Sequence, residues 1–168
     1  MNKQNGITLI ALTVTIVVMM IIAGITINIG QNLIQEAKIQ DLRTNMLLIQ
    51  AEAKKDLEEV NFQKITTIDA AKDHLIGEPV QEITDETAKN AIQEVVVNKL
   101  EKELDDTYFY INPDVLNSLG IKDLNTEDYG YFVVQYNLSD TKVEVINTNG
   151  YQGYYTLTAI NNINNEDI

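Results

Sequence analysis

The feature that most constrains this chain is a run without any charged side chain between Lys3 and Glu36. Within it, residues 7–29 are apolar except for a few threonines and Asn28. As a helix rising about 1.5 Å per residue, this stretch reaches about 34 Å, which exceeds the roughly 30 Å hydrocarbon core of a bilayer. Because lipid offers no hydrogen-bond partners, the backbone must satisfy itself as a helix. The sequence therefore predicts a transmembrane helix over residues 7–30.

Charge is divided sharply between the two ends of this run. The leader, residues 1–6, carries Lys3 and the terminal amine, whereas every acidic residue lies at Glu36 or beyond, and the chain has a net charge of −13. The cationic leader favours an N-terminus in the cytoplasm, with the rest of the chain outside it. An acidic surface repels nucleic acid, so we expect no direct binding to it.

Composition also excludes several kinds of chemistry. The chain has no cysteine and one histidine, so disulfides, thiol catalysis and Cys/His zinc sites are ruled out. The part outside the membrane must therefore be held together by its own core, by assembly, or by both.

Two general interpretations compete for the apolar run. A cleaved secretory signal normally has an apolar region of about 7–15 residues that ends at a small-x-small site. This run is longer, and Ile22-Ala23-Gly24 is a poor site that lies inside further apolar sequence. A plain membrane anchor fits the hydropathy equally well without giving the order of the residues any meaning.

The order of the residues supports a third interpretation. Lys3-Gln4-Asn5-Gly6, followed by Ile7-Thr8-Leu9-Ile10-Ala11-Leu12, resembles the N-terminal signal of type IV pilins and pseudopilins, and in particular of pilin-like proteins from Gram-positive anaerobes. The resemblance covers about the first 30 residues. It implies that a prepilin peptidase cuts between Gly6 and Ile7 and that the new amino group of Ile7 is methylated. Glycine suits a cut site because it has no Cβ to obstruct the extended backbone.

One departure from the family pattern bears on the role of the protein. The fifth residue after the cut is Ala11, where the family normally has a glutamate that meets the terminal amine of a neighbouring subunit. A buried charge is costly unless it is paired, so its loss is tolerable but weakens the register of assembly. The resemblance therefore implies a minor or accessory subunit. The second departure, Ile7 in place of phenylalanine, is mild.

An amphipathic helix is predicted after the apolar run, over residues 31–60, with Gly30 as a flexible joint. Apolar residues recur there at spacings of three and four, which places them on one face. They are Ile39, Leu42, Met46, Ile49, Ala53, Leu57 and Val60. We expect this stripe to pack on the chain's own globular head, residues 61–160; a coiled coil with a partner is the alternative.

Shorter signals follow in the head. Asp69–Ile76 is predicted as a helix ending at Gly77 with Pro79 beyond it, and Asp85–Leu104 as a second helix from apolar residues four apart. Tyr108–Ile111 is predicted as a strand. Asn112 and Pro113 indicate an N-cap and first residue of a helical turn that Gly120 closes.

The last third of the chain changes to a two-residue period. Strands are predicted over Tyr131–Tyr136, Lys142–Ile146 and Tyr154–Ile160, with turns at Asn137–Asp140 and Asn147–Gly150. Val143 and Val145 alternate with polar neighbours, as in a half-buried antiparallel strand. The predicted fold class is α+β, a long N-terminal helix on a three- or four-stranded β-meander, and residues 161–168 are predicted to be a flexible tail.

The residue types that could carry catalysis do not form a recognisable site. His74 has only Ser118 and Ser139 as serine partners, and neither lies in a nucleophile elbow, so a surface or cap position is expected. Asp123–Asp128 alternates oxygen ligands but lacks the glycine and glutamate of an EF-hand, which leaves a looser calcium site or a solvated turn. The acidic residues and the tyrosines have simpler explanations, a solvated helix end and strand packing respectively. These sets are Glu101, Glu103, Asp105 and Asp106, and Tyr108, Tyr110, Tyr129, Tyr131, Tyr136, Tyr151, Tyr154 and Tyr155.

The expected function is therefore structural, with no enzymatic activity and no cofactor or metal. The resemblance implies a subunit of a type IV pilus or of a type II secretion-like pseudopilus, with prepilin peptidase, other pilin-like subunits and an assembly platform as partners. The subunit would lie in the cytoplasmic membrane as a single-pass protein before assembly and at the cell surface afterwards. The alternative is a non-polymerising, single-span surface protein whose outer domain binds a ligand.

Overall fold

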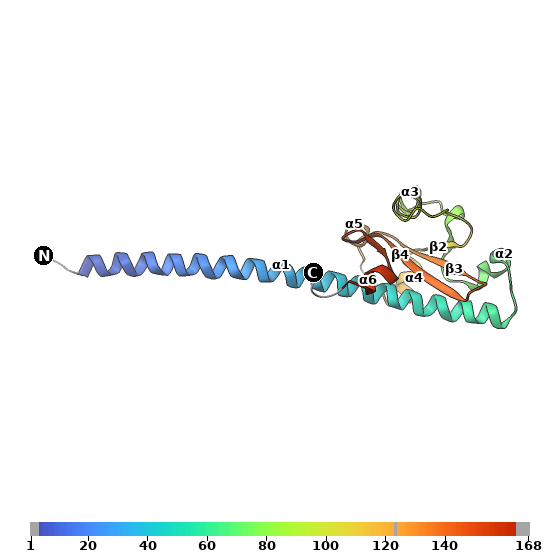
Figure 1. Ribbon diagram of the computed structural model, residues 1–168, viewed down its shortest axis with the longest axis horizontal. Helices are drawn as coiled ribbons and strands as arrows, with labels where there is room; N and C mark the ends of the chain where they lie inside the picture. The colour runs from blue at the N-terminus through green and yellow to red at the C-terminus, as the bar shows by residue number, and fades with distance from the viewer. Residues whose placement is uncertain (1–3, 123, 164–168) are drawn as a thin grey trace. The chain divides into compact units, whose positions relative to one another are not determined.

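The computed structural model of the chain describes residues 4–122 and 124–163, and the early side chains it describes are those of Leu12, residues 15–20 and residues from 34 onward. The chain divides into two compact units, residues 1–39 and residues 40–167. We call the described part of the second unit, residues 40–163, the head (Figure 1).

The first element, α1, is one long helix, Gln4–Phe62. It continues through Gly30 as a helix, so the joint expected there is not a break in the secondary structure. The predicted apolar stripe of its second half is confirmed, because all seven members are at most 5% exposed. Amphipathic spacing thus located the buried face of this half correctly.

The head contains a five-stranded antiparallel sheet of order β1-β2-β3-β4-β5, so each strand pairs with the next one along the chain. The meander prediction is confirmed, with more strands than expected. The strands are β1 (Glu78–Pro79), β2 (Tyr108–Ile111), β3 (Phe132–Asn137), β4 (Lys142–Tyr151) and β5 (Tyr154–Thr156).

Both faces of the sheet are covered. Tyr110, Val133 and Ile146 pair across β2, β3 and β4, and they pack against the helical segment Glu86–Lys99. Their neighbours in the chain point to the opposite face, toward the second half of α1. Figure 1 shows the sheet between α1 and α3. Because both faces are covered, all four residues of β2 are buried. Packing on one face alone would leave alternate residues exposed to solvent.

Two strands end more than one residue away from the predicted position. Asn147–Gly150 is not a turn but part of β4, which continues to Tyr151 with a register irregularity against β5. The predicted strand Tyr154–Ile160 ends at Thr156. There the Thr156 side chain accepts a hydrogen bond from the Ala159 amide and begins α6, Leu157–Asn161. A local cap therefore outcompetes β propensity at that point.

The helix predicted over Asp85–Leu104 begins as expected but ends early. Asp85 caps α3 (Glu86–Gln93) by accepting from the amides of Thr87 and Ala88. The chain then widens into a π-helical segment, η3 (Glu94–Lys99), and Glu101 takes a left-handed φ of 53° that closes it. The acidic set Glu101–Asp106 is exposed as expected, but it follows the helix and does not form its end.

The remaining short helices lie where they were predicted but differ from the prediction in length. In place of the helix predicted over Asp69–Ile76, the structure has α2 (Ile68–Ala71), which begins one residue earlier, and the 3₁₀ turn η1 (Lys72–His74). A second 3₁₀ turn, η2 (Val80–Glu82), follows β1. Asn112 caps α4 (Pro113–Ser118) as predicted by accepting from the Val115 amide at 3.0 Å. The helix α5 (Thr126–Tyr129) precedes β3.

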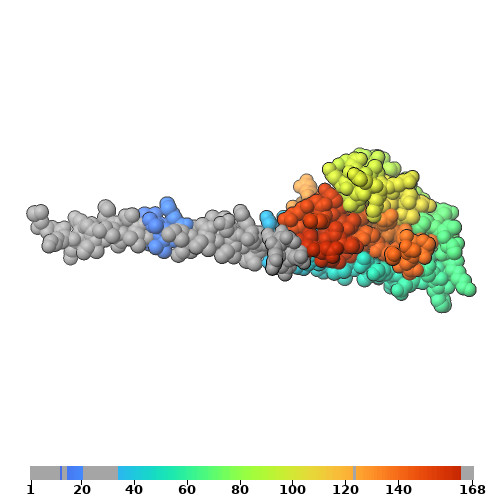
Figure 2. All heavy atoms as spheres, in the orientation of Figure 1, coloured from blue at the N-terminus to red at the C-terminus, as the bar shows by residue number. Residues whose placement is uncertain are grey.

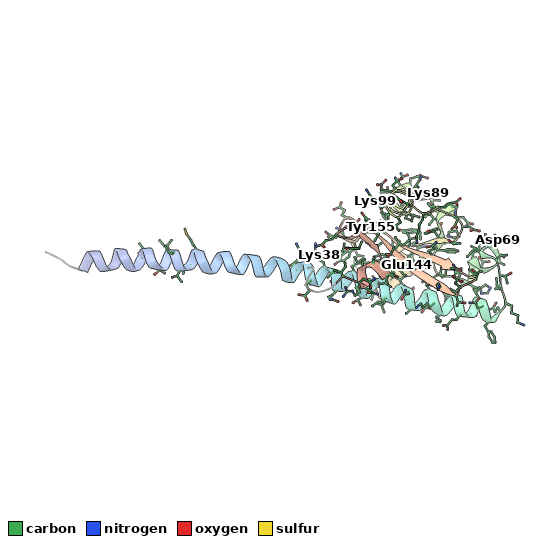
Figure 3. All side chains as sticks on the ribbon, in the orientation of Figure 1. Lys38, Asp69, Lys89, Lys99, Glu144 and Tyr155 are labelled. Carbon is green, nitrogen blue, oxygen red and sulfur yellow. The ribbon has the colours of Figure 1, made fainter. Side chains whose placement is uncertain are left out.

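The described part of the chain ends in the core. Ile163 is 7% exposed and therefore belongs to the core, contrary to the expectation of a flexible tail from residue 161. Residues 164–168 lie outside the described part of the chain. Glu144, labelled in Figure 3, ties α6 to β4 by accepting from the Thr158 amide at 3.1 Å and the Thr158 hydroxyl at 2.6 Å.

Candidate functional site

The residues predicted for processing lie at the beginning of α1. Gly6, Ile7, Thr8, Leu9, Ile10, Ala11 and Leu12 are all helical there. Of their side chains only that of Leu12 is described, and it is 62% exposed. The predicted roles of Gly6 and Ile7 therefore rest on the sequence.

Further along α1, the described side chains are apolar and open. From Ile16 to Met20 the exposed fractions run from 46% to 70%, and these residues are shown in blue in Figure 2. Transfer of apolar side chains out of water is favourable. A contiguous group of exposed apolar side chains therefore marks a surface that needs a covering partner or lipid. Among the residues described, no helix has a stretch long and apolar enough to cross a membrane. Most side chains of the predicted span, residues 7–30, lie outside that set.

The second half of α1 is fixed to the sheet by polar contacts as well as by its apolar stripe. The Gln50 amide donates to the Val143 carbonyl at 3.4 Å, and the Asn61 amide donates to the Thr141 hydroxyl at 2.8 Å. Near the start of the head, the Arg43 guanidinium donates to the Ile160 carbonyl at 2.9 Å. These contacts fix where the helix lies along the strands and which of its faces meets the sheet.

A small cluster under α1 joins it to the sheet. The Tyr136 hydroxyl donates to the Ile76 carbonyl at 3.1 Å, and its ring meets Phe109 edge to face with centroids 5.2 Å apart. Burial, followed by the nearby Asp56 carboxylate, raises the pKa of Tyr136 well above its usual value. Burial and then the charge of Glu52 raise the pKa of Asp56. These perturbed groups have a structural explanation, namely the packing of helix on sheet.

Gly77 is required at this junction. Its φ is +97°, and a Cβ there would lie 2.8 Å from the Tyr110 carbonyl oxygen. Any side chain would push β1 away from β2, so this glycine, predicted as a helix stop, instead permits two strands to approach closely.

Several of the tyrosines predicted to pack in strands do so: three are buried, and Tyr131 and Tyr155 are partly buried against the core. Tyr108, Tyr110 and Tyr136 are at most 6% exposed. Burial, followed by the charges of Asp105 and Asp85 respectively, raises the pKa values of Tyr108 and Tyr110 to about 12. The hydroxyls are thus held neutral. Tyr154 is 46% exposed, so strand packing does not account for it.

The candidate catalytic and metal residues do not come together in the described part of the chain. His74 is exposed, while the Ser118 and Ser139 hydroxyls donate to the Val115 carbonyl and the Asn137 side chain, both at 2.7 Å. Asp123 lies outside the description, and Asn125 caps α5 by accepting from the Glu127 amide. Among the described residues, no three acidic or histidine side chains are placed to hold a metal ion.

One pocket in the head was not anticipated from the sequence. It has a volume of about 220 Å³ and lies where β2 ends, β3 begins and α4 and α5 pack. Its wall includes the rings of Tyr110 and Tyr131, which meet edge to face at 6.1 Å. The aliphatic wall includes Leu116 and Ile121, and Asn117 lies at the rim. The lining residues all lie within one stretch of the chain, Tyr110–Phe132, and only the way in which this stretch folds brings them around a pocket.

Known proteins supply no further guide. Comparison of the chain with protein-family models, curated proteins and solved structures finds no match.

A second feature missed at the sequence level is Phe62, the last residue of α1. It is 88% exposed, more than any other large apolar side chain described. The stripe that predicts the buried face of α1 ends at Val60, and Phe62 lies about 160° away from it around the helix axis, taking 100° per residue. The sequence indicated this exposure, because Phe62 does not belong to the apolar stripe.

Proposed function

We propose that this protein is a pilin-like structural subunit of a type IV pilus or pseudopilus-type filament, cut after Gly6 and assembled through the apolar half of α1. The observation that carries the proposal is the sequence Gly6–Leu12, which opens an uncharged segment that continues, in one helix, into the amphipathic half of α1. That half packs on a five-stranded antiparallel meander, an arrangement that suits an apolar stalk carrying a globular head.

The proposed assembly step exchanges lipid for protein. Apolar side chains such as Ile16–Met20, open in the single chain, become buried against the same segment of neighbouring copies. Dispersion and apolar packing supply the driving force, because Ala11 provides no carboxylate to pair with a neighbour's terminal amine. This favours a minor or accessory subunit, processed by prepilin peptidase and extracted by an assembly platform.

The test is the identity of the first residue after processing. The full chain is expressed with its cognate peptidase and its N-terminus is measured by mass spectrometry. A mature chain that starts at Ile7, with or without an added methyl group, supports the proposal. A chain that still starts at Met1 in the presence of active peptidase contradicts it and favours a non-polymerising single-span surface protein.

A matched pair of glycine variants separates processing from general effects on the helix. Gly6→Ala should slow cleavage strongly, because a Cβ at the cut obstructs the extended backbone. Gly24→Ala, in the same apolar run, should be processed at the normal rate. Equal processing of the two variants would show that Gly6 has another purpose.

A further inference from the structure

We propose that Asn147 is a positioning residue whose side chain protects the neighbouring Asn149–Gly150 pair from spontaneous deamidation in the folded head. The sequence contains two Asn–Gly pairs, Asn5–Gly6 and Asn149–Gly150, and only the second lies in the head. The inference goes beyond the proposed function and holds however the N-terminus is processed.

An asparagine followed by glycine can undergo a reaction that needs only water. The Gly150 nitrogen loses its proton and attacks Asn149 Cγ, so that a new C–N bond forms. The bond between Cγ and Nδ2 breaks, and the side-chain nitrogen takes up a proton and leaves as ammonia. Water then opens the resulting succinimide to aspartate or isoaspartate. Glycine makes the attack easy because no side chain hinders its nitrogen and its backbone is flexible.

The fold requires a glycine at this position, so replacement of Gly150 cannot remove the reactive pair without strain. Gly150 has a φ of +56°, in the left-handed region that favours glycine, and a Cβ there would collide with the Tyr154 carbonyl oxygen in β5. The close approach of β4 and β5 therefore places a labile sequence in the sheet.

Burial does not protect the pair. Asn149 is exposed and Gly150 is half-buried, so water reaches the side chain that would react. Any protection that the fold provides must therefore come from hydrogen bonds that hold the reacting atoms.

The attacking nitrogen is held by Asn147, which is completely buried. The Asn147 side-chain oxygen accepts from the Gly150 amide at 2.9 Å and from the Asn149 amide at 3.1 Å. The Asn147 nitrogen donates to the Tyr129 carbonyl at 2.7 Å, which fixes the orientation of the side chain. The proton that Gly150 must lose is thus the one that it donates to Asn147, and its removal breaks a hydrogen bond to a buried acceptor.

The group that is attacked is held as well. Asn149 Nδ2 donates to the Glu127 carbonyl in α5 at 3.1 Å. Ring closure draws Asn149 Cγ onto the Gly150 nitrogen and pulls the side chain away from this carbonyl. Both reacting groups must therefore give up a hydrogen bond before the reaction can proceed.

Deamidation would remove a contact that the fold uses. A carboxylate at Asn149 has no hydrogen to donate to the Glu127 carbonyl, and it adds negative charge to a chain whose net charge is already −13. Isoaspartate would also add a carbon to the backbone of β4 just before Tyr151, which pairs with Tyr154. By preventing the reaction, Asn147 preserves the contacts that join β4 to α5 and β5.

The test measures deamidation of the full chain in detergent at neutral pH. Trypsin cuts after Lys142, and fragment masses of the peptide that follows locate the conversion of amide to acid at Asn149. The folded wild type should react at least about tenfold more slowly than the same chain unfolded in urea. Asn149→Ser, which has no amide to lose, is the blank. Equal rates in the folded and unfolded chain would overturn the proposal.

Asn147→Ala separates the hydrogen bonds of Asn147 from general stability, with Leu57→Ala as its control. Both variants destabilise the head, but only Asn147→Ala removes the acceptor of the Gly150 proton. While folded, Asn147→Ala should deamidate at Asn149 about tenfold faster than the wild type, and Leu57→Ala should keep the wild-type rate. An unchanged rate in Asn147→Ala contradicts the proposal. An equal rise in both variants does the same, because it shows that general loosening of the head exposes the pair.

Hydrogen exchange of the wild type provides a readout that needs no variant. Exchange removes the same Gly150 amide proton that the reaction must remove. Measured by NMR, this amide should exchange at least about tenfold more slowly in the folded chain than in urea, although it follows an exposed residue. Exchange at the unfolded rate would show that Asn147 does not hold the proton, and it would overturn the proposal even if Asn147→Ala failed to fold.

Discussion

The two halves of α1 place their apolar side chains in different surroundings. In the second half, apolar residues recur every three or four positions and are buried on the head's own sheet. In the first half, apolar residues occupy every face, and the described ones from Ile16 to Met20 are largely exposed. A periodic stripe needs one neighbour, which the same chain supplies. A helix that is apolar all round needs cover on all sides, which this chain does not supply for the residues described.

One charge placed in each half of α1 should have different consequences. Ile49→Asp puts a carboxylate without a partner at a position that is 0% exposed, at a cost of several kcal/mol, comparable with the whole stability of a domain. We expect the head to lose its protease resistance. Val17→Asp should leave the head resistant, and, if residues 7–30 span a membrane as proposed, it should disfavour insertion by about 2.5–3.5 kcal/mol and lower the share of the chain in the membrane fraction. Loss of head resistance in Val17→Asp would contradict the distinction.

A smaller change measures what the stripe contributes. Leu57→Ala should lower the free energy of unfolding of the head by about 2–5 kcal/mol, because Leu57 is completely buried and its loss leaves a cavity. Leu48→Ala, at a position 45% exposed on the same helix, should change it by less than about 0.5 kcal/mol. Urea unfolding of the full chain in detergent provides both values, and equal losses would mean that the stripe is not the packing face.

The sheet contains a polar side chain that is completely buried, that of Asn147. Its amide donates to the Tyr129 carbonyl at 2.7 Å, and its oxygen accepts from the amides of Asn149 and Gly150 at 3.1 and 2.9 Å. Asn147→Ala leaves these groups unpaired and should cost about 2–3 kcal/mol. The exposed Asn90→Ala is the control and should change stability by less than about 0.5 kcal/mol. Unchanged stability in Asn147→Ala would show that water replaces the lost contacts.

The smallest expected effect concerns pH. Burial raises the pKa of Asp56, so the folded head binds this proton more tightly than the unfolded chain does. Stability from this group is present below the ordinary aspartate pKa of about 3.9 and is lost as pH rises through the raised value. Asp56→Asn, which keeps an oxygen for the Ile76 amide, should lack this loss. Unfolding measured from pH 4 to pH 7 should show the variant gaining on the wild type as pH rises; a constant difference would contradict the assignment.

The sequence alone predicted those elements whose local pattern and tertiary surroundings agree. The Ile39–Val60 stripe is confirmed because it depends on periodicity, and the Asn112 cap because its side chain bonds to its own neighbours. The strand Tyr108–Ile111 is confirmed because aromatic and β-branched residues favour strands. The same holds for the predicted exposure of His74. The processing residues Gly6 and Ile7 remain a prediction from the sequence.

Only the tertiary structure decided the features that join distant segments. Asn147–Gly150 has turn-forming residues, yet pairing and the buried amide of Asn147 keep it in β4. The four apolar steps from Ala88 to Leu104 continue past the point where the helix ends, because Leu100 and Leu104 reach the same core from a loop. The uncharged run was evident from the first residues, because hydropathy is a property of sequence, whereas the partner for each apolar surface depends on which segments the fold brings together.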